Sequence, residues 1–179
     1  MAHILPVFTK LWDNYPNSHD TAAVKKEIGG NVDAAWITNT CTIRLSRALN
    51  YAGSKVPAAF PGLNVVRGAD KLFYAFRVKE MNKYMTAHFG ASTHTSLGGA
   101  DGRTAVAGKR GIIMFDVQGW NDATGHFDLW NGTAPRYSEY FDKAREVKLW
   151  VCPLRISERC PSCRWCAPRW RGAPSRRRP

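Results

Sequence analysis

The chain has 179 residues, 44% of them hydrophobic, and a formal net charge of +12 at pH 7. This length can bury one core, whereas two full domains would each be small, so we expect a single globular domain. No apolar run approaches the ~18 to 20 residues that span a bilayer, which excludes a transmembrane helix. The N-terminus lacks the charged start and long apolar centre of a signal peptide, so we expect synthesis in the cytoplasm and any export without a cleaved signal.

Apolar residues recur at helical spacing in three segments of the first part of the chain, residues 8–15, 20–28 and 41–52. Pro16 should end the first helix, because proline cannot continue the backbone hydrogen bonding. Gly29 should end the second, because glycine tolerates the left-handed backbone at a helix end. The sequence therefore predicts three helices before residue 53.

The second part of the chain is expected to supply the strands. After the loop-rich residues 53–71, the predicted elements are a short strand over 72–77, a helix over 78–89, a mobile loop over 91–108, and strands over 111–117, 126–132 and 146–151. The loop is predicted from its Gly, Ser and Thr content, and we expect it near the functional site. Helices followed by strands indicate an α+β fold in which a helix packs on an antiparallel sheet.

Cys41 is the only cysteine in the first 151 residues, and it stands where the third helix should begin. Asn39 and Thr40 before it are residue types that cap helix N-termini. A cysteine in the first turn meets unpaired backbone N–H groups and the positive end of the helix dipole, which favour thiolate over thiol. Cys41 is therefore a candidate nucleophile, with a buried structural cysteine as the alternative.

His126 and Asp128 stand two residues apart in a predicted strand. With a period of two, His126, Asp128 and Trp130 share one face, while Phe127 and Leu129 should face the core. A carboxylate beside a histidine can fix the tautomer that leaves the other ring nitrogen free as a base. The same pair could instead be solvated polar side chains on a strand face, or two ligands of a metal ion.

The positive charge is concentrated in a C-terminal tail. Residues 155–179 contain eight Arg and one Glu, a net charge of +7, which leaves +5 of the total +12 for residues 1–154. We expect residues 1–154 to form the domain and residues 155–179 to be disordered. Arginines interleaved with Trp165 and Trp170 could instead bind nucleic acid or an anionic membrane surface.

The cysteines of the tail are poorly spaced for zinc. Cys160, Cys163 and Cys166 follow Cys152 within a short segment, whereas a zinc knuckle normally needs two well-separated pairs. We therefore expect neither a metal ion nor another cofactor.

A cysteine at a helix start, followed by a strand that opens with Gly-His and continues Leu-Trp-Asn-Gly, resembles the papain-like amidases of NlpC type. More narrowly, the chain resembles the fourth family of type VI secretion amidase effectors. The matching stretches, in the order expected for that family, are GGNV at 29–32, NTCTIRLS at 39–46, GADKLFY at 68–74, KRGII at 109–113 and GHFDLWNG at 125–132. The resemblance implies a papain-like α+β fold whose helix-borne nucleophile packs on an antiparallel sheet.

The resemblance also implies a function, that of an antibacterial toxin which a type VI secretion apparatus injects into the periplasm of a rival cell. Its substrates would be peptidoglycan stem peptides, cut between γ-D-glutamate and meso-diaminopimelate. A cognate immunity protein would have to block the cleft around Cys41, and the segments 91–108 and 119–125 are its expected contacts.

The resemblance assigns Cys41 as the nucleophile and His126 as the general base. Some relatives carry the acid about eleven residues after the histidine, where this chain has Tyr137 and Ser138. Relatives that read Gly-His-x-Asp-Leu-Trp carry a carboxylate at the position of Asp128, which we expect to be the third member. The reserves in the sequence are Glu139, Asp142 and, less favoured, His94.

The expected reaction is acyl transfer through a thioester. Cys41 would attack the γ-glutamyl carbonyl, its backbone N–H and one further donor would hold the oxyanion, and His126 would protonate the departing amine. Asn39 is a candidate for the second donor, with helix capping as the alternative. Trp120 and Asn121 precede His126 and would either line the substrate groove or pack their own loop.

Two other functions remain open. A papain-like groove that binds stem peptides without cutting them is disfavoured by the intact Cys41 and His126. A basic nucleic-acid-binding protein would depend on the tail alone, so removal of residues 155–179 would abolish its activity but spare an amidase.

Overall fold

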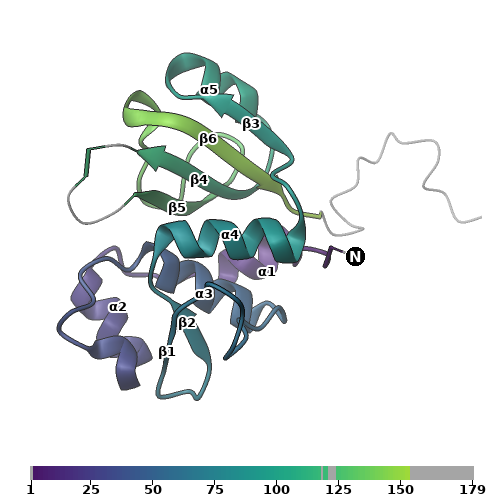
Figure 1. Ribbon diagram of the computed structural model, residues 1–179. Helices are drawn as coiled ribbons and strands as arrows, with labels where there is room; N and C mark the ends of the chain where they lie inside the picture. The colour runs from purple at the N-terminus through teal and green to yellow at the C-terminus, as the bar shows by residue number, and fades with distance from the viewer. Residues whose placement is uncertain (1, 118, 121–123, 154–179) are drawn as a thin grey trace, which may run out of the picture.

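A four-stranded antiparallel sheet forms one half of the molecule (Figure 1). The computed structural model describes residues 2–117, 119–120 and 124–153. The strand order is β3-β6-β4-β5, and every neighbouring pair is antiparallel. The strands are β3 (His94–Leu97), β4 (Gly111–Val117), β5 (Gly125–Trp130) and β6 (Ala144–Val151). The predicted α+β fold with an antiparallel sheet is confirmed.

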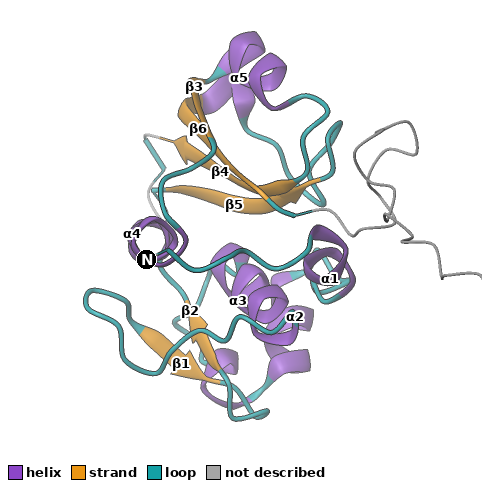
Figure 2. Ribbon diagram, turned by 90° about the vertical axis from the view of Figure 1, so that its right-hand side faces the viewer, coloured by secondary structure: helices purple, strands orange, loops and turns teal. Residues whose placement is uncertain are grey.

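Helices lie on both sides of this sheet (Figures 1 and 2). The helices are α1 (Phe8–Asp13), α2 (Thr21–Ile28), α3 (Cys41–Tyr51), α4 (Val78–Phe89) and α5 (Gly99–Val106), with 3₁₀ turns η1 (Gly30–Asp33) and η2 (Phe141–Lys143). α1, α3 and α4 lie below the sheet, whereas α5 lies above it. A small hairpin of β1 (Val65–Arg67) and β2 (Phe73–Ala75) contacts α3.

Local capping chemistry explains where the early helices begin and end. At the start of α2, the backbone N–H of Ala23 donates to Asp20 Oδ1 at 2.6 Å. Gly29 ends this helix with a φ of 66°, which glycine adopts at little steric cost. α3 begins at Cys41 and closes before Gly53, whose φ is 96°. The helices predicted in the first part of the chain are therefore confirmed.

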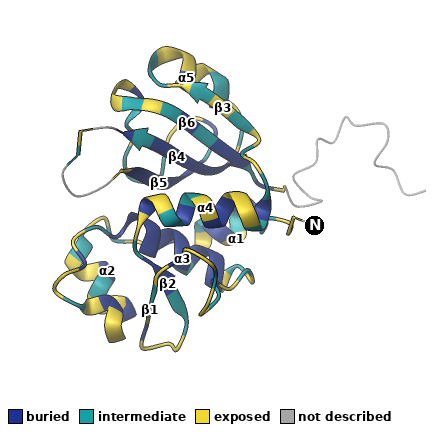
Figure 3. Cartoon of the chain, viewed as in Figure 1, coloured by how far each residue is buried: buried dark blue, intermediate teal, exposed yellow. Residues whose placement is uncertain are grey.

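Two hydrophobic clusters fill the two faces of the sheet. The lower cluster joins Met114, Phe127 and Leu129 to α1, α3 and α4, and the upper cluster joins Phe115 and Val147 to α5 and η2. Every residue of β5 is buried, although β5 is an edge strand (Figure 3). The prediction that Phe127 and Leu129 face the core is confirmed, and the opposite face of this strand is buried as well.

Residues 91–108 are largely secondary structure, so the prediction of a loop there was wrong. They contain β3 and α5. A Cβ at Gly98 would lie 1.9 Å from the carbonyl oxygen of Ala144, and one at Gly102 would lie 2.5 Å from that of Leu97. Only glycine fits such close backbone contacts. The glycines that suggested flexibility therefore permit tight packing of α5.

Within the described residues, no helix combines the length and apolar composition needed to cross a bilayer. The predicted tail, residues 155–179 with its three cysteines, lies outside the described residues. Its separation from the domain at residues 1–154 therefore stays a prediction.

Candidate active site

Cys41 is the first residue of α3 and is buried, with 1% of its surface exposed. Its backbone N–H donates to Asn39 Oδ1 at 3.0 Å. The Thr40 side chain makes no capping hydrogen bond, so Asn39 supplies the cap. Capping is thus the contact that Asn39 makes in this structure, while its side-chain amide NH₂ group is not used in that contact and is able to donate to a bound group.

His126 interacts with both Cys41 and Asp128. Its ring is nearly buried, and Nε2 is 3.8 Å from Asp128 Oδ2, which is too long for a hydrogen bond. Burial lowers the pKa of His126, but the adjacent Asp128 carboxylate and Cys41 side chain outweigh this and raise it to about 9. The imidazole therefore carries a proton at neutral pH.

Asp128 is held by backbone groups and is fully buried. Its Oδ1 accepts from the N–H of Leu129 at 2.8 Å. Its Oδ2 accepts from the N–H of Tyr137 at 2.8 Å and of Ser138 at 3.0 Å. Three donors fix the carboxylate in one orientation toward His126 and offset the cost of burying its charge.

Tyr15 belongs to the same site, although the sequence pattern marked it only as an apolar position of the predicted helix over 8–15, and it follows the end of α1. It is buried, and it lies close enough to Asp128 for the carboxylate to act on its hydroxyl. Burial, followed by the charges of Asp128 and Cys41, raises the pKa of Tyr15 well above its ordinary value. Its hydroxyl therefore stays protonated and able to donate to the carboxylate.

Arg44 brings a buried positive charge to this region. It is 5% exposed, and its Nη2 donates to the carbonyl oxygen of His19 at 2.5 Å. Its guanidinium lies 5.5 Å from the centre of the Tyr137 ring, and its charge lowers the pKa of Tyr15. The sequence contained one signal for it, an arginine between Ile43 and Leu45 in the first turn of the predicted helix.

The reserve residues are not brought to His126. Glu139 is exposed and forms an ion pair with Arg103 of α5. Asp142 is exposed in η2, and His94 lies in β3 opposite Leu149 of β6. None of the three is among the groups that shift the pKa of His126.

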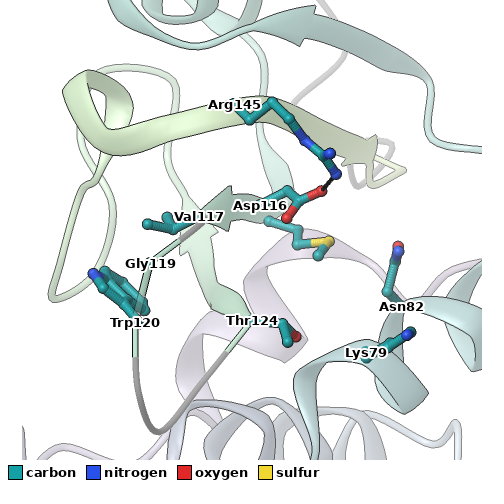
Figure 4. A pocket seen from close by; sticks show the side chains of 9 residues that line it. Lys79, Asn82, Asp116, Val117, Gly119, Trp120, Thr124 and Arg145 are labelled. Carbon is teal, nitrogen blue, oxygen red and sulfur yellow. Dashed lines mark hydrogen bonds and ion pairs between the residues drawn. The ribbon is translucent and has the colours of Figure 1, made fainter.

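Trp120 packs against Tyr140 and also lines a pocket of about 400 Å³ (Figure 4), so both of its expected roles stay open. Its ring centre is 4.8 Å from that of Tyr140, and the Tyr140 centre is 5.1 Å from that of His126. Tyr140 therefore links Trp120 to His126. Asn121 lies outside the described residues, so its role stays a prediction.

Two pockets flank these residues. One, of about 400 Å³, is lined by Lys79 and Asn82 of α4 together with Asp116 and Arg145 (Figure 4). Asp116 and His126 do not share a face of the sheet, because His126 is paired with the preceding residue of β4. The carboxylate of Asp116 therefore does not face the imidazole, although Trp120 and Thr124, near His126 in the chain, line the same pocket.

The second pocket, of about 230 Å³, adjoins the residue that caps α3. It is lined by Trp36, Ile37, Thr38, Asn39, Phe76 and Arg77. Because Asn39 accepts from the backbone of Cys41, this pocket opens beside the candidate nucleophile. Among the described residues, no group of three or more His, Cys, Asp or Glu side chains could hold a metal ion.

Solved structures of related proteins share this fold. The crystal structure of the type VI effector Tae4 from Enterobacter cloacae is 33% identical, has a TM-score of 0.77, and the match covers 86% of this chain and 100% of that chain. The Tae4–Tai4 effector–immunity complex from the same organism gives 31% identity, 84% and 100% coverage and a TM-score of 0.77. The Tae4–Tai4 complex from Salmonella Typhimurium is 31% identical and has a TM-score of 0.75, and the match covers 83% of this chain and 99% of that chain.

Sequence comparison points the same way. The family described as type VI secretion system (T6SS) amidase effector protein 4, Tae4, matches residues 37–150. No curated protein sequence matches the chain. The family match spans α3 and β5, the two elements that carry Cys41 and His126. This chain therefore belongs to the Tae4 family of type VI secretion amidase effectors.

Proposed function

We propose that this chain hydrolyses the bond between γ-D-glutamate and meso-diaminopimelate in peptidoglycan stem peptides, with Cys41, His126 and Asp128 as its catalytic triad. Membership of the amidase effector family supports the reaction class. The observation that carries the assignment of residues is the buried cluster in which His126 interacts with both Cys41 and Asp128. A protonated imidazole beside a thiolate is the pair from which a cysteine nucleophile attacks.

The first step forms a thioester. The Cys41 sulfur bonds to the γ-glutamyl carbonyl carbon, and the carbonyl electrons move onto the oxygen. His126 then transfers its proton to the departing diaminopimelate nitrogen as the carbon–nitrogen bond breaks. Asp128 holds the ring in position and stabilises its charged form. Water, deprotonated by the now neutral His126, hydrolyses the thioester and restores the thiolate–imidazolium pair.

The oxyanion needs hydrogen-bond donors, and in the free protein one of the expected donors is already bonded to another group. The N–H of Cys41 is bonded to Asn39 Oδ1. Rotation of the Asn39 side chain would free this N–H and could turn the Asn39 amide toward the same oxygen. Donors aimed at a developing oxyanion are worth about 10²- to 10³-fold in rate, so this rearrangement would be an efficient use of the capping residue.

Partners follow from the proposed reaction. A toxin that cuts the cell wall requires an inhibitor in the cell that makes it, and relatives of this chain are found as Tae4–Tai4 effector–immunity complexes. A cognate immunity protein would cover the cleft at Cys41. Segment 119–125, of which residues 121–123 lie outside the described residues, is its expected contact, whereas segment 91–108 forms β3 at the far edge of the sheet and α5 above it, away from α3 (Figure 1). Delivery by a type VI secretion apparatus would bring the enzyme to its substrate in the periplasm of a target bacterium.

The test is digestion of peptidoglycan that contains meso-diaminopimelate, with mass spectrometry of the soluble fragments. The wild-type chain should release fragments that end in D-glutamate, and Cys41→Ala should release none. Cys152→Ala is the matched control, because Cys152 is equally buried but its pKa is raised to about 12 by burial, which leaves it unreactive. Intact stem peptides from the wild type would favour a binding module without catalysis.

A further inference from the structure

Trp36 is unusual among the tryptophans that the structure describes, because it alone is exposed, with 59% of its surface accessible. Tryptophan is normally largely buried, since exposing an indole sacrifices much hydrophobic burial. The ring is nevertheless held in place. Its centre is 5.0 Å from that of Phe76, with the two rings at 75°. The Arg77 guanidinium lies 5.4 Å from the centre of the same Phe76 ring.

This aromatic surface lies along one side of the nucleophile. Trp36 lines the 230 Å³ pocket that also contains Thr38 and Asn39, and Asn39 accepts from the backbone of Cys41. An extended chain spans at most ~3.6 Å per residue. Five residues therefore place the backbone of Trp36 within about 18 Å of that of Cys41, which is within reach of one bound substrate.

The position of the pocket selects one end of that substrate. All its lining residues come from the segment before α3 or from the segment after β2, and none comes from β5. His126, on β5, would protonate the leaving amine, so the diaminopimelate part lies toward β5. The pocket beside Asn39 is thus left for the acyl part, which runs from the γ-glutamyl residue through alanine to the muramyl sugar.

The chemistry of the pocket suits that acyl part. An indole face is electron-rich and packs against the polarised C–H groups on the face of a pyranose ring. Thr38 and Asn39 offer polar groups for hydroxyl or acetamido substituents. Arg77 has an exposed side chain that is paired through Nη1 with Glu80, which leaves donors for the free carboxylate of the glutamyl residue.

We infer that Trp36 and the pocket it lines bind the muramyl sugar of the glycan strand, so that the enzyme prefers stem peptides that are still attached to glycan over free peptides. This inference rests on the proposed amidase function. The alanine and lactyl groups between the glutamyl residue and the sugar span on the order of 10 Å when extended. The glutamyl residue adds roughly 5 Å, so the sugar lies about 15 Å from the scissile carbonyl at most, on the scale of the separation between Cys41 and Trp36.

The test compares kcat/KM for two substrates with the same stem, a disaccharide tetrapeptide and the free tetrapeptide. The wild type should prefer the disaccharide form, and Trp36→Ala should lose about tenfold on that substrate, the scale of stacking a ring on an aromatic side chain. Its rate on the free peptide should stay within about twofold, and Trp36→Phe should recover part of the loss. Leu97→Ala, which truncates another exposed apolar side chain, is the control.

A second measurement separates this inference from the proposed function. Isothermal titration of the Cys41→Ala protein with both substrates reports binding without cleavage, and only the disaccharide form should lose affinity when Trp36→Ala is added. Arg77→Gln should weaken both substrates alike, because both carry the glutamyl carboxylate. Equal loss on both substrates with Trp36→Ala, or no sugar preference in binding, overturns the inference. Failure of the wild type to cleave either substrate overturns the proposed function instead, and the titration still decides whether Trp36 binds sugar.

Discussion

Replacing Asp128 by asparagine removes one negative charge beside His126 with almost no change in shape. In the wild-type protein the pKa of His126 rises from 6.5 to about 9, although burial alone would lower it. Asp128 and Cys41 are the two groups that raise it. Without the Asp128 charge, we expect the pKa of His126 to fall by at least about one unit, which corresponds to about 1.4 kcal/mol of lost preference for the protonated ring.

The same change should lower stability in two ways. Asparagine has a single acceptor oxygen, whereas Asp128 uses both oxygens to accept from Leu129, Tyr137 and Ser138. At least one buried N–H would lose its partner, at a cost of about 1–3 kcal/mol. In addition, a folded-state pKa above the unfolded value stabilises the folded protein fully below about pH 6.5, and this contribution is lost as pH rises through about 9. The free energy of unfolding of Asp128→Asn should therefore depend less on pH between about 6.5 and 9 than that of the wild type.

The assay is an NMR titration of the His126 ring in the wild type and in Asp128→Asn, together with urea unfolding and hydrolysis rates. We expect the hydrolysis rate to fall by about 10²- to 10⁴-fold, the usual worth of a correctly oriented acid–base group. Glu139→Gln is the control, because Glu139 is exposed and pairs with Arg103. An unchanged pKa of His126 in Asp128→Asn, or full activity there with loss in Glu139→Gln, would refute the proposed triad.

Two further predictions concern the proton on His126 and the cap of α3. Hydrolysis by the wild type should decline as pH rises through about 9, because neutral His126 cannot protonate the leaving amine. An NMR titration of Cys41→Ala should show a lower pKa of His126 than in the wild type, because one of the groups that raise this pKa is gone. An unchanged pKa in that variant would place the thiol too far away to act. Asn39→Ser keeps a capping oxygen but lacks the amide, so stability to urea should change by less than about 1 kcal/mol while the hydrolysis rate falls about 10²-fold or more. A full rate in Asn39→Ser would leave Asn39 with capping as its only role.

Local chemistry made part of this structure predictable from the sequence. The start of α3 at Cys41 follows from the capping residue types before it. β4 follows from an apolar run of strand length, and β5 follows from its alternating pattern. The segment 91–108 was misjudged because glycine content indicates flexibility only where nothing packs closely. Gly98 and Gly102 instead lie so close to other backbone atoms that a Cβ would not fit. For Gly98 the neighbour is Ala144, which is distant in sequence, so the local pattern could not show this contact.

The surroundings of Asp128 show what pattern reasoning on one strand misses. Alternation predicted one buried and one open face for β5, yet His126 and Asp128 are buried too. Tyr15, from a segment more than 80 residues away in sequence, lies close enough to Asp128 for the carboxylate to raise its pKa. A charge buried in this way must be compensated, and the compensation comes from donors rather than from a surface ion pair.

The position about eleven residues after His126 illustrates how the same site can be built with different residues. The family resemblance led us to consider an acid there, whereas this chain has Tyr137 and Ser138, and the backbone N–H groups of these two residues donate to Asp128. The segment thus still serves the proposed triad, but it holds the carboxylate instead of supplying it. A carboxylate on β5 itself needs such donors, because its strand is buried on both faces. The raised pKa of His126 also depends on Cys41 of α3, and so not on the His-x-Asp spacing alone.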